Sequence, residues 1–191
     1  MGFTKAELES YRDATLPDLI GPKTRLLFVG INPGLWTAAA QAHFARRGNR
    51  FYPALKLAGI IDRPIDASAG YDPKDLAYLL DRGIGITNLV ARATARADEL
   101  SPQELAAGGR SLEAKVAEIG CPVVAVLGIT AYRMAYRRPK AVAGKQPETL
   151  GGAQLWVVPN PSGLNAHSTP ASLAAAYREV ALAAGLQLAP V

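Results

Sequence analysis

The stretch RLLFVGINPGL, at residues 25–35, decides the fold that we expect for this chain. Leu26–Val29 is a short apolar run of the kind that forms a buried strand, and Gly30 allows the turn that ends it. Asn32 then stands between this strand and a Pro-Gly pair. An asparagine in such a place is usually a turn former. A rigid strand end can also direct its side chain at a bound ligand, so the motif leaves two roles open.

Short apolar runs and helical patterns alternate along the chain. Further strands are predicted at Thr87–Val90, Val123–Leu127 and Leu155–Val158. Helices are predicted at Tyr52–Ile60, Asp75–Leu80 and Ser101–Ile119, with a last helix that begins at Thr169 or Ser172. Loops are predicted at Arg63–Gly70 and Arg137–Gly152. This alternation predicts an α/β fold in which helices cover both faces of a mostly parallel sheet.

Length and composition are those of one globular domain, residues 1–191, with peripheral or frayed ends at about 1–20 and 186–191. Hydrophobic residues make up 49% of the chain, and no apolar stretch is long enough to cross a membrane. The first residues show no signal-peptide pattern, so we expect a cytoplasmic protein, associated with the nucleoid if it is bacterial. The single cysteine, Cys121, excludes an internal disulfide and is expected to be buried and inert.

The basic residues gather in two clusters in or beside predicted loops. The first contains Arg46, Arg47 and Arg50, and the second contains Arg133, Arg137, Arg138, Lys140 and Lys145. Together with a net charge of +5, the clusters allow a polyanionic partner without proving one. A solvated surface is the alternative for each cluster taken alone.

Three unusual loops follow predicted strands, at the sheet edge where α/β proteins bind ligands. They are GINPGL at residues 30–35, ARATARADEL at residues 91–100 and PNPSGLNAH at residues 159–167. Each can be a structural turn, but two Asn-Pro loops after two parallel strands are harder to explain in that way. GINPGL lacks the glycine spacing of a P-loop and the GxGxxG pattern, which disfavours a nucleotide-binding enzyme.

The chain resembles the mismatch-specific uracil- and thymine-DNA glycosylases, the second family of the uracil-DNA glycosylase superfamily. The motifs that carry the resemblance are GINPG at 30–34, GNRFY at 48–52, GITNLV at 85–90, S-x-x-E-L-x-x-GG-R at 101–110 and PNPSGL at 159–164. It extends from about Arg25 to Leu182. It implies a three-layer α/β/α sandwich and cleavage of the bond between a flipped base and its deoxyribose. It also implies that no metal or other cofactor is needed.

The resemblance gives Asn32 a catalytic role, because it matches the asparagine that holds the attacking water. A carboxamide oxygen orients water but is a very poor base. Most of the rate is then expected from stabilising the departing base as an anion, to which the backbone N–H groups of Ile31 and Asn32 contribute.

The same resemblance implies a pocket for the flipped pyrimidine. Phe44 is expected to stack on the base, with a core position as its alternative. His43 either lines the same pocket or lies on the surface. Asn88 offers a donor and an acceptor to the pyrimidine edge, and Thr37 is expected to crowd a methyl group at C5.

The PNPSGLNAH loop matches the segment that enters DNA. Leu164 is the expected wedge that fills the space left by the flipped nucleotide. Ser162, Gly163 and Asn165 are expected beside the opposite base, with backbone contacts to guanine. The expected phosphate contacts are Arg46, Arg47, Arg50 and Lys145.

Asp98 is a further candidate for the chemistry, ahead of Glu99. A carboxylate there could activate water or balance the charge of an oxocarbenium-like sugar. Acids that precede the Ser101 helix are the alternative.

The sequence therefore predicts a monomeric, monofunctional glycosylase that removes uracil opposite guanine from double-stranded DNA. Thymine and adducted pyrimidines are further candidate bases. The alternative is a protein of the same fold that binds mismatched DNA without cutting.

Overall fold

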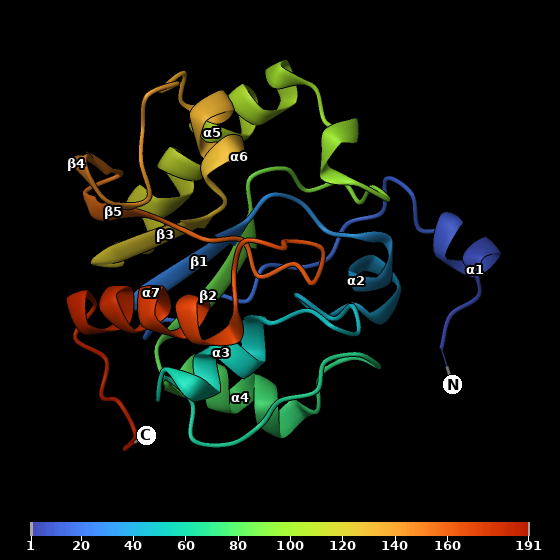
Figure 1. Ribbon diagram of the computed structural model, residues 1–191, viewed down its shortest axis with the longest axis horizontal. Helices are drawn as coiled ribbons and strands as arrows, with labels where there is room; N and C mark the ends of the chain where they lie inside the picture. The colour runs from blue at the N-terminus through green and yellow to red at the C-terminus, as the bar shows by residue number, and fades with distance from the viewer. Residues whose placement is uncertain (1, 191) are drawn as a thin grey trace.

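A parallel sheet forms the centre of the computed structural model, which describes residues 2–190. The fraying predicted for Met1 and Val191 therefore lies outside the described residues. The strands are β1 at Leu26–Gly30, β2 at Ile84–Asn88, β3 at Val123–Leu127, β4 at Gly144–Leu150 and β5 at Ala153–Val158. Their order is β2-β1-β3-β5-β4 (Figure 1). All neighbours are parallel except β4, which pairs antiparallel with β5. The predicted mostly parallel sheet is confirmed.

Helices cover both faces of this sheet. One face packs against α3 at Phe51–Leu57, α4 at Pro73–Asp81 and α7 at Pro170–Ala183. The other face packs against α5 at Pro102–Ile119 and α6 at Ile129–Ala135 (Figure 1). Successive side chains of β1 point to opposite faces of the sheet. Leu26 and Phe28 therefore pack in the core against α3, α4 and α7, and Leu27 and Val29 pack in the core against α5 and α6. The three-layer α/β/α prediction is confirmed.

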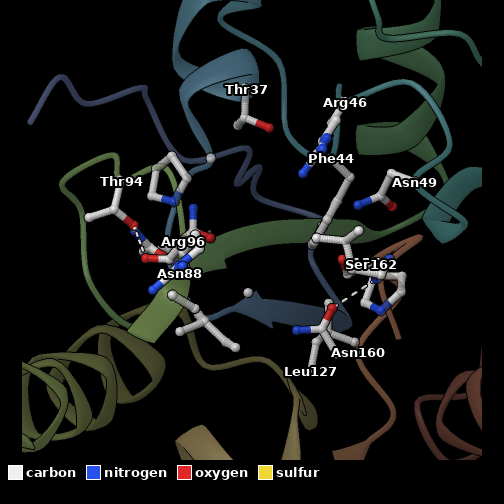
Figure 2. Close-up of a pocket in the computed structure, with 18 of the residues that line it drawn as sticks. Thr37, Phe44, Arg46, Asn49, Asn88, Thr94, Arg96, Leu127, Asn160 and Ser162 are labelled. Carbon is white, nitrogen blue, oxygen red and sulfur yellow. Dashed lines mark hydrogen bonds between the residues drawn. The ribbon is translucent and has the colours of Figure 1, made fainter. Parts of the chain in front are cut away.

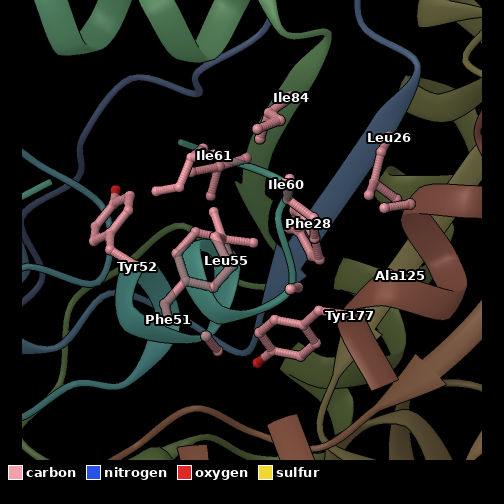
Figure 3. Close-up of a cluster of buried hydrophobic side chains, with 14 of the residues drawn as sticks. Leu26, Phe28, Phe51, Tyr52, Leu55, Ile60, Ile61, Ile84, Ala125 and Tyr177 are labelled. Atoms are coloured by element: carbon pink, nitrogen blue, oxygen red, sulfur yellow. The ribbon is translucent and has the colours of Figure 1, made fainter. Parts of the chain in front are cut away.

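An aromatic cluster ties β1 to the helices of the first layer. The ring of Phe28 lies 5.1 Å from that of Phe51 on α3 and 5.5 Å from that of Tyr177 on α7 (Figure 3). All three side chains are fully buried. Large aromatic surfaces removed from water contribute strongly to core stability. The cluster therefore gives the end of β1 and the start of α3 a rigid support.

The two longest helices begin where their capping residues predict. Ser101 accepts a hydrogen bond from the Glu104 N–H, and the Glu104 carboxylate accepts one from the Ser101 N–H, which is a complete capping box. Thr169 caps α7 in the same way, so this helix starts at Thr169 and not at Ser172. The first residue of each helix is set by residues close to it in the chain, so it can be predicted from the sequence alone.

The prediction was wrong at several shorter elements. Strand β2 spans Ile84–Asn88, not Thr87–Val90, and β4 lies inside the predicted loop Arg137–Gly152. Pro147 argued against a strand at this place, because proline in a sheet is tolerated only on edge strands or at bulges. β4 is an edge strand, and its pairing with β5 is irregular between Lys145 and Thr149. The short helices α1 at Lys5–Glu9, α2 at Leu35–Ala40 and α6 were not predicted. Helices of this length show little periodicity.

The N-terminal segment is less peripheral than expected. Leu19 is buried and exchanges two backbone hydrogen bonds with Ile86 of β2, at 2.9 and 2.7 Å. Cys121 is buried, as predicted, and burial raises the pKa of its thiol. Within residues 2–190, no helix has the length and hydrophobicity needed to cross a bilayer.

Candidate active site

A cavity of about 380 Å³ opens where the carboxyl ends of the parallel strands meet. The loops after β1, β2 and β5 all contribute to its lining, so the structure brings together the three loops that the sequence singles out. Figure 2 shows Thr94 and Arg96 on one side of the cavity and Arg46 and Asn49 on the other. This is the sheet edge at which α/β proteins place their ligands.

Asn32 is held in this cavity by its amide nitrogen. Nδ2 donates to the backbone oxygen of Arg92 at 3.0 Å and to Oγ1 of Thr94 at 2.7 Å. The Thr94 hydroxyl donates its own proton to the Arg96 carbonyl at 2.8 Å, so towards Asn32 it acts as an acceptor. An acceptor needs a donor, so the NH2 group of the Asn32 amide, and not its oxygen, faces Thr94. Among the described residues, no donor is bonded to Oδ1 of Asn32, which leaves this oxygen available to a water.

The carbonyl that binds Asn32 belongs to a residue that is itself fixed. The Arg92 guanidinium pairs with Glu104 at 2.6 Å and with Asp13 at 3.0 Å. Hydrogen bonds from Arg92, and then from the Ser101 backbone, lower the pKa of Glu104 to about 2. The charged pair therefore persists at neutral pH and links the loop after β2 to the start of α5.

Phe44 lines the cavity with its backbone in the left-handed region, at φ 55°. Such a conformation costs a non-glycine residue roughly 1–3 kcal/mol and persists only where the surroundings enforce it. Two contacts do so here. The ring stacks on Phe51 at 4.1 Å and 27°, and the hydroxyl of Tyr52 donates to the His43 carbonyl at 3.0 Å. The Phe44 ring is therefore held in place at the wall of the cavity.

Gly30 is required by the close approach of Asn88. The two residues are register partners in β1 and β2, and a Cβ on Gly30 would lie 2.5 Å from Oδ1 of Asn88 and 3.5 Å from Cζ of Phe44. Any larger residue would displace the Asn88 amide from the cavity. The absence of a side chain at Gly30 therefore makes room for the side chains of Asn88 and Phe44.

His43, Thr37 and Ile31 complete the predicted base pocket. His43 is buried, so its surface alternative is wrong, and Nε2 lies 3.0 Å from the Pro17 carbonyl. Burial lowers the pKa of His43, so the imidazole is neutral at physiological pH. Thr37 is buried on α2, and Ile31 is half-buried after β1. All three side chains line the cavity.

Leu164 extends from the loop after β5 with 76% of its surface exposed, and it also lines the cavity. An exposed leucine beside a pocket suits the predicted wedge. The neighbouring backbone groups are already bonded: the Asn165 N–H donates to the Ser162 carbonyl at 3.0 Å, and the carbonyls of Gly163 and Asn165 accept from Arg50. A contact between guanine and the Gly163 carbonyl, the Asn165 carbonyl or the Asn165 N–H would have to share or replace these bonds.

The predicted phosphate contacts are not all in one place. Arg46 is exposed at the cavity, and the Arg47 guanidinium lies 5.9 Å from the centre of the Trp36 ring. Arg50 turns inward to the carbonyls of the Leu164 loop. Lys145 is not brought to the cavity: it lies on β4 and lines a separate hollow with the second basic cluster.

Asp98 lies at the cavity, but it is not a buried base. Its side chain is 67% exposed and pairs with Arg96 at 3.0 Å. It belongs to a short 3-10 helix, Ala97–Glu99, just before the Ser101 cap. The geometry therefore favours the alternative, an ordinary acid leading into α5.

Several residues of this site were not singled out as site residues from the sequence. They are Thr94, Arg96, Asn49 and Asn160. Thr94 is the most informative, since it is 1% exposed and fixes the Asn32 amide. A single threonine in an irregular loop carries no periodic signal, and only its position in the second of the three loops pointed to it. Within residues 2–190, no group of three or more His, Cys, Asp or Glu side chains is arranged to hold a metal ion.

Comparison with known proteins identifies the family and the fold. The family model described as the uracil DNA glycosylase superfamily matches residues 17–181. The chain belongs to this superfamily. Its fold is also similar to the solution NMR structure of a protein from Methanosarcina acetivorans that is described as a candidate uracil DNA glycosylase. That likeness has a TM-score of 0.59 at 17% identity and covers 88% of this chain and 98% of the other.

In the uracil DNA glycosylase superfamily the substrate is DNA, and membership supports a uracil glycosylase activity in general. Asn32, Phe44 and Asn88, which the resemblance singled out, all line the one cavity described above.

Proposed function

We propose that this protein is a monofunctional DNA glycosylase of the mismatch-specific kind. It hydrolyses the N-glycosidic bond of a uracil that is flipped out of duplex DNA opposite guanine, and so starts base excision repair. Thymine and adducted pyrimidines are proposed as slower substrates, because the buried Thr37 crowds the C5 side of the pocket. We further propose that it acts as a monomer in the cytoplasm.

The observation that carries this proposal is the state of the Asn32 amide. Its nitrogen is bonded to the Arg92 carbonyl and to Thr94, its oxygen has no hydrogen-bond donor among the described residues, and Asn32 lines a cavity together with Phe44 and Asn88. An acceptor fixed in this way orients a water for attack at the anomeric carbon. A protein that only binds mismatches has no use for it.

The remaining groups act on the base. Phe44 covers one face of the pyrimidine, and the Asn88 amide matches donors and acceptors on its edge. The glycosidic bond breaks with its electron pair moving to the base, which leaves as an anion. Water then adds to the positive sugar carbon and releases a proton to solvent. Backbone N–H groups at Ile31 and Asn32 are proposed to stabilise the anion.

The test uses a duplex oligonucleotide with a single G·U pair, incubated with the protein and then treated with alkali. Strand breaks at the uracil are expected, with fewer breaks for an A·U pair, for a G·T pair and for uracil in a single strand. A stable complex without breaks would show a non-catalytic mismatch-binding protein. Equal cleavage of G·U, A·U and single-stranded uracil would contradict mismatch specificity while leaving uracil excision intact.

A further inference from the structure

The loop that carries Leu164 is held mainly by Arg50. The Arg50 guanidinium donates to the carbonyl of Asn165 at 3.1 Å, to that of Gly163 at 3.2 Å and to that of Ser168. The Arg50 N–H adds a bond of 2.9 Å to the Pro161 carbonyl. One residue at the start of α3 thus fixes four carbonyls of a loop more than a hundred positions later in the chain.

The backbones of the two loops also touch directly. A Cβ on Gly163 would lie 2.7 Å from the Gly48 carbonyl oxygen, so only glycine fits between them. Arg50 is half-buried, and the Asn165 side chain closes the loop by donating to the Asn160 carbonyl at 3.1 Å. Leu164 nonetheless stays exposed at the tip. The contacts therefore order the loop without covering its apolar residue.

We infer that Arg50 is a positioning residue for the Leu164 loop and not a phosphate contact. Its planar guanidinium presents donors on separate nitrogens in a rigid fork, so it reaches carbonyls spread along the loop, whereas the three donors of a lysine ammonium share one nitrogen. A loop ordered before DNA arrives lets Leu164 enter the duplex without first losing conformational freedom. The inference rests on the proposed function for the role of Leu164, but the order of the loop in the free protein can be measured without any activity.

The first experiment compares R50Q and R50K with R47Q, a matched control that removes one positive charge from an arginine that makes no bond to this loop. Hydrogen exchange of the free protein is expected to speed up at residues 160–168 in R50Q and R50K and to stay unchanged there in R47Q. Exchange in the sheet reports whether each variant is folded. Unchanged exchange of the loop in R50Q and R50K overturns the inference, whether or not the protein excises uracil.

The second experiment separates positioning from phosphate binding. R50Q and R50K should each slow single-turnover excision from a G·U duplex about tenfold. This is less than the roughly 100-fold loss expected when a group that contacts the reacting atoms is removed. In the Leu164→Ala background the same changes should cost less than about twofold, because residues that act as a unit are non-additive. The slope of log affinity against log salt should fall by about 0.9 for R47Q and remain unchanged for R50Q.

A phosphate contact predicts the opposite pattern, with R50K close to the parent protein and a reduced salt slope for R50Q. That result overturns the inference. If the parent protein excises no uracil, the proposed function fails, and the hydrogen-exchange result still decides whether Arg50 orders the loop.

Discussion

At Asn32, the residue that is proposed to hold the water is itself held by two acceptors. The amide cannot rotate without breaking its bonds to the Arg92 carbonyl and to Thr94. An amide is a poor base, so this arrangement supplies orientation and not proton transfer. A slow enzyme is therefore expected, in which leaving-group stabilisation provides most of the rate.

Replacement of Asn32 by alanine should lower single-turnover excision from a G·U duplex on the order of 100-fold, because it removes the acceptor proposed to orient the water. Duplex affinity, measured by fluorescence anisotropy, should change little. A near-parental excision rate would remove Asn32 from the mechanism.

Thr94→Val keeps the shape of a buried side chain and removes the acceptor for Nδ2 of Asn32. The Asn32 amide is then held by the Arg92 carbonyl alone and rotates more easily, so single-turnover excision should fall about tenfold, or about 1.4 kcal/mol. Thr94→Ser keeps the hydroxyl and is the matched control, with a rate close to that of the parent. Equal losses in both variants would point to packing and not to the hydrogen bond.

Among the elements, the loop after β5 differs most from an ordinary connection. It contains an exposed leucine between residues whose polar groups are bonded to one another and to Arg50. The place of this leucine, at the rim of the cavity, is what suits the proposed interaction with unstacked DNA. The same loop also places Asn160 at the cavity.

Leu164→Ala should slow excision about tenfold on a paired G·U duplex, because the wedge helps to offset the few kcal/mol lost when the base leaves the stack. The effect should be about threefold or less when the uracil sits in a bulge, where less stacking has to be broken. The measurement is single-turnover cleavage of both substrates in parallel. Similar losses on both would count against a wedge.

On the scale of the whole molecule, the sheet brings three loops to one edge and leaves basic side chains around it. Arg46 and Arg96 lie on opposite sides of the cavity (Figure 2). The Arg47 guanidinium lies over the ring of Trp36. The net charge of +5 has the sign that a DNA-binding protein needs. A duplex would cross this edge with its phosphates on both sides of the pocket.

Duplex affinity should therefore fall linearly on a log–log plot as salt is raised from about 50 to 200 mM, with each phosphate contact adding about 0.9 to the slope. Arg46→Gln should reduce the slope by about that amount. Lys145→Gln, in the separate hollow on β4, serves as the distant comparison and should change the slope less. A flat salt dependence would mean that the basic clusters are only solvated surface.

The sequence by itself determined the elements whose signals are local. The capping box of Ser101 and Glu104, the cap at Thr169 and the apolar runs of β1 and β3 were predicted because neighbouring residues decide them. It also indicated that the loops after β1 and β5 meet, since the carboxyl ends of parallel strands share one edge. Strand β4 was missed because Pro147 and the flanking glycines hide an edge strand.

Only the tertiary structure decided what each side chain does at that edge. The bond from Asn32 to Thr94 joins residues 62 positions apart, and the bonds from Arg50 to the Leu164 loop span 113 to 118 positions. Such contacts depend on the distance between separate loops, which packing of the whole core sets. Arg50, expected from its charge to contact phosphate, instead faces inward to backbone carbonyls. The physical reason is that the sequence shows residue types and the spacing of apolar residues, from which local structure can be predicted. A hydrogen bond between distant residues also needs the fold to bring the two groups within about 3 Å of each other.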